Sequence, residues 1–334
     1  MKLSFFSTTT VAAIVASSTL LANTATAAPA IQFDLGGKFD KSFNEAAYNG
    51  AERWKSEYGE DYANVELAND GQRIQNITRL AQRGGNPVVT VGFSNEQALS
   101  QVAPQFPDTD FTIIDMVVDQ PNVRSVVFKE HEGSFLVGAL AVMKSESGVV
   151  GFVGGMDIPL IRRFGCGYAQ GAKHVNPDAT VLENMTGTTP SAWNDPTKGA
   201  ELTRAQFAQG ADVVFAAAGG TGVGVYQAAA DEGKYAIGVD SNQNHLQPGT
   251  MLTSMVKRVD KAVYNAFKDA SDGNYSYGLQ VLGLAEEGVD WALDEHNESL
   301  VSAKMVQQVE RLRTDIITGK IVVHDYMSNG ECNI

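Results

Sequence analysis

The stretch that most constrains the fold is residues 31–54, IQFDLGGKFDKSFNEAAYNGAERW, which joins an apolar run, a double glycine and an amphipathic pattern. The apolar run ends at Gly36-Gly37, as a buried strand does when a turn stops it. Ser42 and Glu45 have the spacing of a capping box, in which both side chains bond backbone N–H groups at a helix start. This order predicts a strand followed directly by a helix.

The predicted cap places Phe43 and Asn44 in the first turn of that helix, at the carboxyl end of the strand. Ligands of open α/β sheets bind at this edge. Together with Asp40, these residues offer an aromatic plane, an amide and a carboxylate, which suit a flat, hydrogen-bonding ligand such as a nucleobase. The alternative is that Phe43 is a hydrophobic staple and Asn44 an ordinary first-turn residue. The local pattern leaves both interpretations open.

The same alternation of strands and helices continues along the chain and starts afresh after an apolar helix over 133–143. Further strands are expected at 65–68, 88–91, 111–114, 125–128, 148–153, 181–182, 212–217 and 235–239. This rhythm predicts an α/β protein with two similar lobes, each a three-layer αβα sandwich with a mainly parallel sheet. The pattern is weaker near the C-terminus, where a helix over 299–318 and a last strand over 321–323 are expected.

Charge and motif content narrow the function. The formal net charge of −14 argues against nucleic acid or an anionic membrane surface as a partner. The five histidines are scattered without metal-ligand spacing, and the sequence has no G-x-S-x-G nucleophile motif. We therefore expect a protein that is not an enzyme and that needs no cofactor or metal.

Residues 1–27 have the pattern of a signal peptide: Lys2, an apolar core over 11–21, and Ala25-Thr26-Ala27 as the cleavage site. No cysteine lies near that site to carry a lipid. The expectation is a soluble, exported protein without a lipid anchor. Cys166 and Cys332 could form a disulfide in an oxidising compartment, but their spacing does not decide whether they do.

Two aspartates follow apolar strands at corresponding places, Asp115 in the first predicted lobe and Asp240 in the second. A carboxylate there can accept hydrogen bonds from neighbouring hydroxyls, as the acidic residue of dinucleotide folds does for a ribose. The alternative for each is a cap or turn residue. Their equivalent positions favour a shared role in binding.

A glycine-rich loop, Ala218 to Gly224, separates a predicted strand from a predicted helix and contains Gly220, Thr221 and Gly222. A nicotinamide cofactor would be one interpretation. However, the glycine spacing departs from G-x-G-x-x-G, and no Gly-Lys-Ser/Thr follows as in a P-loop. The loop better suits a neutral ligand that approaches the backbone.

Three other side chains have two interpretations each. Lys257 follows a strand, where its ammonium could donate to ligand oxygens or remain solvated. Trp193 lies in a predicted loop, either packing between the lobes or forming a second stacking plane. The Arg162-Arg163-Phe164 segment could reach the cleft or face water.

With these residues in view, the chain resembles the basic membrane protein family of ABC-transporter substrate-binding proteins, which includes purine-nucleoside receptors. The resemblance extends from about Ile31 to Asp269 and rests on several motifs in order: 40–44 (DKSFN), 132–138 (EGSFLVG), 161–164 (IRRF), 210–215 (GADVVF), 218–222 (AGGTG), 237–240 (IGVD) and 253–257 (TSMVK).

The resemblance implies a type I periplasmic-binding-protein fold that closes on a nucleoside, expected to be a purine nucleoside, and presents it to an inner-membrane permease. It implies that Phe43 stacks on the base, that Asn44 and Asp40 bond its edge, and that the Gly220–Gly222 loop lines the cleft. It also assigns the ribose to a group of three residues, namely Asp115, Asp240 and Lys257.

Three further expectations accompany this assignment. Lobe 1 should comprise residues 28–128 and about 257–278, and lobe 2 residues 129–256 and about 279–334. Family members are commonly lipoproteins, whereas this chain lacks a cysteine at the expected place, which favours a receptor that diffuses freely in the periplasm. We also expect this receptor to be a monomer. The alternatives are a receptor of the same fold for another small polar ligand and a signalling sensor. A nucleoside-degrading or NAD-dependent enzyme is less favoured.

Overall fold

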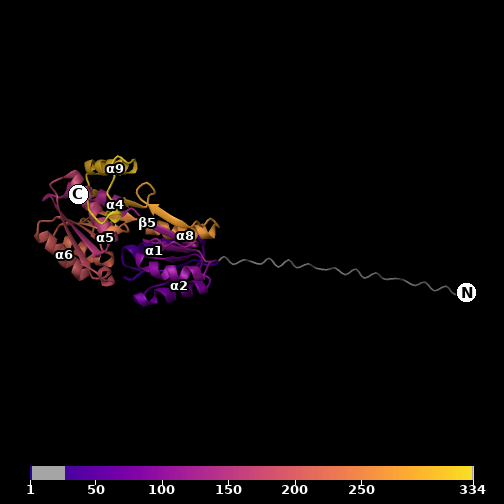
Figure 1. The fold of residues 1–334 in the computed structure, drawn as a ribbon. Coiled ribbons are helices and arrows are strands. Elements are labelled where there is room, and N and C mark those ends of the chain that lie inside the picture. The colour runs from indigo at the N-terminus through magenta and orange to yellow at the C-terminus, as the bar shows by residue number, and fades with distance from the viewer. Residues whose placement is uncertain (2–26, 333) are drawn as a thin grey trace.

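The computed structural model describes Met1, residues 27–332 and Ile334 (Figure 1). The predicted signal peptide therefore lies almost wholly outside the described residues. The described chain forms two α/β lobes side by side, each built on a six-stranded sheet. This arrangement confirms the predicted fold class.

The first sheet has the strand order β11-β5-β4-β3-β1-β2, and all of its pairs are parallel. Its strands are β1 (Ala30–Gln32), β2 (Ala63–Val65), β3 (Val88–Thr90), β4 (Phe111–Ile114), β5 (Val123–Phe128) and β11 (Gly278–Leu282). The central strands β1, β3 and β4 are buried throughout, as parallel strands covered on both faces must be.

The second sheet has the order β12-β10-β9-β8-β6-β7 and is parallel except for the edge pair β10–β12. Its strands are β6 (Val149–Met156), β7 (Thr180–Gly187), β8 (Val213–Ala217), β9 (Tyr235–Asp240), β10 (Met251–Lys257) and β12 (Val289–Trp291). The two sheets thus share one plan, in which the first strand of each lobe, β1 or β6, lies next to the edge strand.

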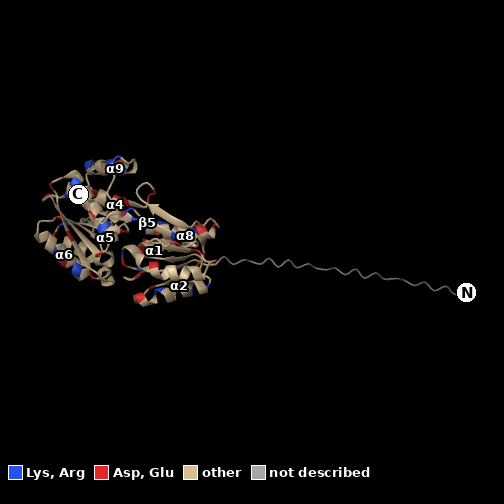
Figure 2. Cartoon of the chain, viewed as in Figure 1, with Lys and Arg blue, Asp and Glu red and all other residues tan. Residues whose placement is uncertain are grey.

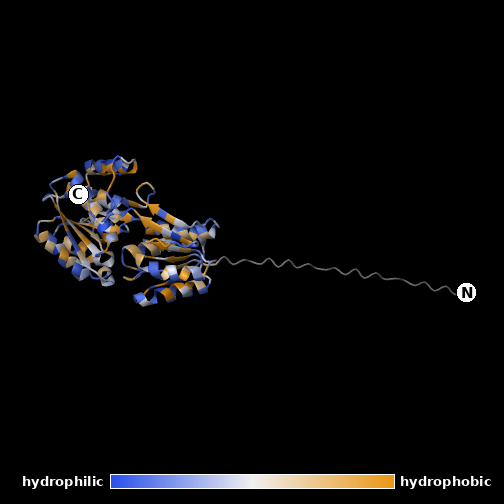
Figure 3. Ribbon diagram, viewed as in Figure 1, coloured by the Kyte–Doolittle hydropathy of each residue, from blue (hydrophilic) through white to orange (hydrophobic). Residues whose placement is uncertain are grey.

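Paired helices cover the sheets. In the first lobe, α1 packs on α8 and α2 on α3; in the second, α4 packs on α5 and α6 on α7. Their bounds are α1 Phe43–Tyr58, α2 Arg73–Gln82, α3 Glu96–Val102, α4 Glu130–Lys144, α5 Pro159–Val175, α6 Pro196–Ala208, α7 Gly222–Asp231, α8 Val259–Ser271 and α9 Ala303–Ile317. Hydrophobic residues concentrate on the strands (Figure 3). Charged residues lie mainly on the outer faces of the helices (Figure 2). No helix among these described residues has the length and hydropathy needed to cross a bilayer.

The α4–α5 pair is packed unusually closely, which matters for the site below. A Cβ on Gly171 would lie 1.9 Å from the Phe135 carbonyl oxygen. Glycine at this position therefore lets the α5 backbone reach α4. The middle of α5 also lies against the start of α4, where a Cβ on Gly167 would lie 2.5 Å from the His131 carbonyl oxygen.

The chain passes between the sheets three times: from β5 to α4, from β10 to α8, and from β11 to β12. The third boundary was expected at about 278, and β11 pairs with β5 as far as Leu282. We propose that lobe 1 comprises 28–128 with 259–282 and that lobe 2 comprises the remainder.

The C-terminal segment also differs from the prediction. Residues 321–323, expected to be a strand, join neither sheet. Instead the segment crosses α5, and Cys332 forms a disulfide with Cys166 at a Cα–Cα distance of 5.5 Å. This disulfide settles the pairing that the cysteine spacing left open.

Candidate functional site

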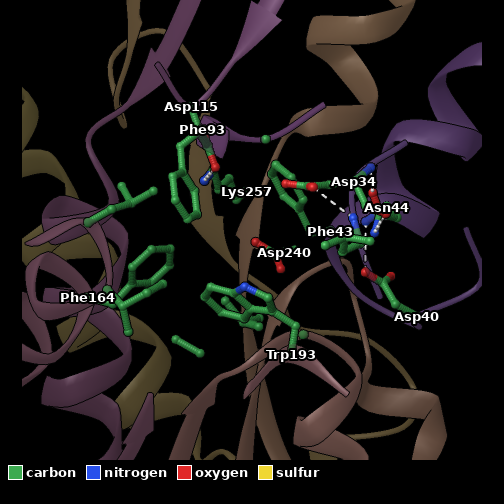
Figure 4. A pocket seen from close by; sticks show the side chains of 17 residues that line it. Asp34, Asp40, Phe43, Asn44, Phe93, Asp115, Phe164, Trp193, Asp240 and Lys257 are labelled. Atoms are coloured by element: carbon green, nitrogen blue, oxygen red, sulfur yellow. Dashed lines mark hydrogen bonds and ion pairs between the residues drawn. The ribbon is translucent and has the colours of Figure 1, made fainter. Parts of the chain in front are cut away.

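The carboxyl ends of both sheets face a cavity that is partly open to solvent (Figure 4). Seven of the ten predicted site residues line it, and they are Asp40, Phe43, Asn44, Asp115, Trp193, Asp240 and Lys257. They come from the first turn of α1, from loops and from strand ends that lie far apart in the sequence. The fold therefore brings most of the predicted residues to one place.

The start of α1 is capped differently from the prediction. The carboxylate of Asp40, rather than the hydroxyl of Ser42, accepts the backbone N–H groups of Ser42, Asn44 and Glu45, at 2.8, 3.0 and 3.1 Å. Glu45 accepts the backbone N–H of Lys41. Asp40 thus caps the helix N-terminus and also lines the cavity, and its expected bond to a ligand stays a prediction.

Ser42 does not cap the helix with its side chain and instead forms hydrogen bonds to the second lobe. Its hydroxyl donates to the Asp240 carboxylate at 2.5 Å, and its carbonyl accepts the Ser241 hydroxyl at 3.1 Å. The side-chain amide of Gln243 also donates to the Lys41 carbonyl at 2.7 Å. These bonds hold the start of α1 against the end of β9 beside the cavity.

Four aromatic side chains from both lobes line the cavity: Phe43, Phe93, Phe164 and Trp193. Phe43 is half-buried and packs against the main core, and Lys257 Nζ lies 5.2 Å from the centre of its ring. Phe43 therefore has a core-side contact and also a face that lines the cavity (Figure 4). This geometry suits stacking on a flat ligand.

Trp193 ends a short 3₁₀ turn, η4 (Pro190–Trp193), and its indole lies against the end of β6. A Cβ on Gly155 would lie 2.1 Å from that ring, so only glycine permits the contact. The indole is thereby held in place on the second lobe.

The glycine-rich loop supports Trp193 more than it contacts the cavity. Gly219 lines the cavity, whereas the predicted Gly220, Thr221 and Gly222 do not. The Thr221 hydroxyl, fully buried, donates to the Ala192 carbonyl at 2.8 Å and accepts the Asp195 N–H at 2.7 Å. The loop therefore positions the η4 turn, and its expected contact with a ligand stays a prediction.

Asp34 was not predicted as a site residue, although it also follows an apolar strand. Its carboxylate pairs with Arg73 at 2.7 Å, and its backbone bonds the Asn44 amide in both directions, at 2.9 and 3.3 Å. Burial raises the pKa of Asp34, although Arg73 opposes that effect. The pair of Asp34 and Asn44 forms a rigid polar edge beside Phe43 (Figure 4).

Asp115 and Asp240 share an unusual backbone conformation. Both have positive φ angles, 71° and 62°, immediately after β4 and at the end of β9. Residues other than glycine rarely adopt this region, and such strain concentrates at functional sites. The equivalent positions expected from the sequence are thus also equivalent in geometry.

Lys257 lies at the end of β10, and its side chain is only 2% exposed. Its ammonium pairs with Asp115 Oδ2 at 2.6 Å and with Glu130 Oε1 at 3.0 Å. The alternative of a solvated lysine is therefore wrong. Glu130, at the start of α4, was not anticipated, because a glutamate at a helix start is commonly explained by the helix dipole.

Burial and charge shift the pKa values of this cluster. Burial raises the pKa of Asp115 to about 6 against the pull of Lys257, and it raises the pKa of Asp240 to about 6 as well. Burial alone would lower the pKa of Lys257, but the carboxylates of Asp115, Glu130 and Asp240 raise it above its usual value. At neutral pH the cluster therefore has one ammonium and charged carboxylates.

A family comparison identifies the chain. The model of the PnrA-like ABC transporter substrate-binding proteins matches residues 30–326. The chain belongs to this family. Its members are solute-binding proteins of ABC transporters, in agreement with the resemblance carried by the motifs.

Individual relatives agree with this assignment. The nucleoside-binding protein BmpA of an ABC transporter in Lactococcus lactis is 32% identical over 318 residues, covering 88% of each chain. A solute-binding protein of an ABC transporter system from Aeropyrum pernix has a solved structure with a TM-score of 0.81 and 29% identity. That match covers 89% of this chain and 93% of the other. The type I periplasmic-binding fold is thereby confirmed.

The expectation of a periplasmic protein without a lipid anchor is wrong. Three Pyrococcus relatives are named lipoproteins, and the one from Pyrococcus horikoshii is 35% identical over 303 residues, covering 86% of this chain and 74% of its own. These names indicate lipid anchoring in the family. The prediction failed because it rested only on the absence of a cysteine near the expected cleavage site, and that absence does not decide whether a protein carries a lipid anchor.

Proposed function

We propose that this protein binds a nucleoside, with purine nucleosides preferred, in the cavity between its lobes and delivers it to the permease of an ABC importer. The observation that carries the proposal is a cavity between the lobes with aromatic planes at Phe43 and Trp193 and a carboxylate–ammonium cluster beside them. A nucleoside has the matching halves, a flat base and a ribose diol. The nucleoside-binding relative in Lactococcus lactis supports the same ligand class.

The base would lie against Phe43, with its polar edge toward Asp34 and Asn44. The side-chain oxygen of Asn44 accepts the Asp34 backbone N–H, and one of its amide N–H groups donates to the Asp34 carbonyl. Its second N–H therefore remains for an acceptor on the ligand. Asp34 Oδ1 accepts the Leu35 N–H and pairs with Arg73. Its Oδ2 is then the oxygen that would accept a ring N–H or an amino group of the base.

The ribose would lie against Asp115, Asp240 and Lys257. Asp115 Oδ1 is buried and has no hydrogen-bond partner within the described part of the chain. A buried acceptor without a partner costs about 1–3 kcal/mol, so a ribose hydroxyl that satisfies it would bind favourably. Lys257 donates one N–H to Asp115 and forms an ion pair with Glu130 Oε1 at 3.0 Å, which leaves an N–H group for a ribose oxygen.

We further propose that the protein is not an enzyme, acts as a monomer and does not bind nucleic acid. The acidic residues of the cavity accept hydrogen bonds or pair with cations, and the net charge of −14 opposes polyanions. A sensor of the same fold, or a receptor for another small polar ligand, is the alternative. A nucleoside-degrading enzyme is the least favoured one.

A thermal-shift screen against nucleosides, free bases, nucleotides and sugars tests the proposal. A ligand at a hundred times its Kd should stabilise the folded state by about 2.7 kcal/mol. We expect such stabilisation with purine nucleosides, and stabilisation by sugars alone would overturn the proposal. Mass spectrometry after incubation with inosine should find intact nucleoside, whereas free hypoxanthine produced at enzymatic rates would establish the enzyme alternative.

A further inference from the structure

The C-terminal segment 321–332 is fastened to one face of α5 at three points. Arg163, Cys166 and Gln170 lie on that face at spacings of three and four residues. Cys166 holds Cys332 by the disulfide, and the Gln170 amide exchanges two hydrogen bonds with the backbone of His324, at 2.8 and 2.9 Å. Arg163 forms an ion pair with Asp325. This segment is therefore set firmly against the helix whose first turns line the cavity.

Arg163 connects the C-terminal segment to the crossing between the lobes. Its Nε and one terminal nitrogen pair with the two carboxylate oxygens of Asp325, each at 2.8 Å. Its other terminal nitrogen donates to Glu130 Oε2 at 2.9 Å and to the Phe128 carbonyl at 2.8 Å. Arg163 is 12% exposed and Glu130 only 1%, so water screens this contact weakly.

Glu130 divides its carboxylate between two cations. Glu130 Oε2 pairs with Arg163, and Oε1 lies 3.0 Å from the Lys257 ammonium. Lys257 in turn pairs with Asp115 at 2.6 Å. Charges alternate along this series, from Asp325 through Arg163, Glu130 and Lys257 to Asp115. The series begins on the disulfide-held segment and ends inside the cavity.

We propose that Asp325 is a positioning residue for Lys257, acting through Arg163 and Glu130, and that the disulfide keeps Asp325 in place to do so. The two bonds from Asp325 fix the plane of the Arg163 guanidinium, so that its third nitrogen meets only one oxygen of Glu130. Without Asp325, Arg163 can swing toward water. Glu130 is then free to draw Lys257 away from Asp115 and from the ligand.

This inference rests on the proposed function only where ligand affinity is the readout. The first experiment compares Asp325→Asn, Asp325→Glu and the parent by calorimetry with guanosine. Asp325→Asn should weaken binding about five- to twentyfold, within the range of couplings across shared ion-pair networks. Asp325→Glu should recover most of the loss, because it restores the carboxylate. The side chain is 30% exposed, so both variants should fold.

The matched control is Asp157→Asn. Asp157 makes the same two-bond pair with the neighbouring Arg162, at 2.7 and 2.8 Å, and its side chain is 32% exposed. Neither Asp157 nor Arg162 lines the cavity or contacts Glu130. The control should bind guanosine as the parent does. Equal weakening by both variants would reduce Asp325 to a structural residue and overturn the proposal.

A second readout needs no ligand. In ¹⁵N-lysine-labelled protein, the ammonium resonance of Lys257, identified by its loss in Lys257→Met, should shift in Asp325→Asn and stay unchanged in Asp157→Asn. A parent that binds no nucleoside but shows this shift would refute the proposed function and leave the positioning role intact. An unchanged Lys257 resonance in Asp325→Asn would refute the positioning role.

The contribution of the disulfide is tested in the Cys166→Ser/Cys332→Ser double variant. Its Lys257 resonance should move in the same direction as in Asp325→Asn, and guanosine binding should weaken. Adding Asp325→Asn to the double variant should then change affinity less than it does in the parent. Full additivity of the two changes would show that the disulfide does not act through Asp325.

Discussion

Replacing Phe43 by alanine separates its two possible roles, ligand stacking and core packing. The ring is half-buried, has one face in the cavity and packs with its other side against the core. Stacking of a base on an aromatic ring contributes about 1–3 kcal/mol, so Phe43→Ala should raise the Kd of a nucleoside by roughly 5- to 150-fold. Truncating a fully buried phenylalanine costs about 3–5 kcal/mol of stability, and the cost at this half-buried ring should stay below about 2 kcal/mol.

The assay combines calorimetry with guanosine and denaturant unfolding without ligand. Phe39→Ala is a suitable control, because Phe39 lies in the loop just before α1 but is 60% exposed and does not line the cavity. The control should keep both affinity and stability. Unchanged affinity in Phe43→Ala together with a loss of stability above 3 kcal/mol, as for a fully buried ring, would place the ring in the core and refute the stacking assignment.

Three further predictions concern the polar end of the cavity. Asp240→Asn keeps the shape of the side chain but removes its charge, so calorimetry should show a larger loss of affinity for ribonucleosides than for 2′-deoxynucleosides; equal losses would remove Asp240 from the ribose. Nucleosides should bind much more tightly than their 5′-monophosphates, because the lining carboxylates repel a phosphate and Lys257 is already paired; equal affinity for adenosine and its monophosphate would contradict this. Because the pKa of Asp115 and of Asp240 is about 6, guanosine affinity should fall as the pH is lowered from 7 to 5. The stability of the ligand-free protein should respond in the opposite way. These two groups should stabilise it increasingly as the pH falls from about 6 to about 4, because the folded state binds their protons more tightly than the unfolded chain does. Affinity that stays flat across pH 5–7 would show that their charged forms do not hold the ligand.

The fold was predictable because each strand–helix unit carries its own signal. The predicted start of the first helix at Phe43 agrees with the structure, as does the paired, two-lobed arrangement. The cap was not predictable, since three polar side chains within six residues compete for the same N–H groups. Ser42 fits the capping pattern locally, yet its hydroxyl bonds Asp240, which lies 198 residues away in the sequence.

The unpredicted parts of the site depend on contacts between distant segments. Glu130 matters because α4 begins beside the end of β10, and nothing near Glu130 in the sequence signals Lys257. The disulfide and the path of residues 321–332 depend in the same way on where α5 lies. Asp34 is a different case. It follows an apolar strand as Asp115 does, so the signal used for Asp115 could have identified it.

The most direct test of the central proposal is a crystal structure of the protein with guanosine. We predict that the base lies against Phe43 with its polar edge at Asp34 and Asn44. The ribose hydroxyls should lie within hydrogen-bonding distance of Asp115, Asp240 and Lys257. A nucleoside bound outside this cavity, or bound inside it with its ribose turned away from those three residues, would contradict the account.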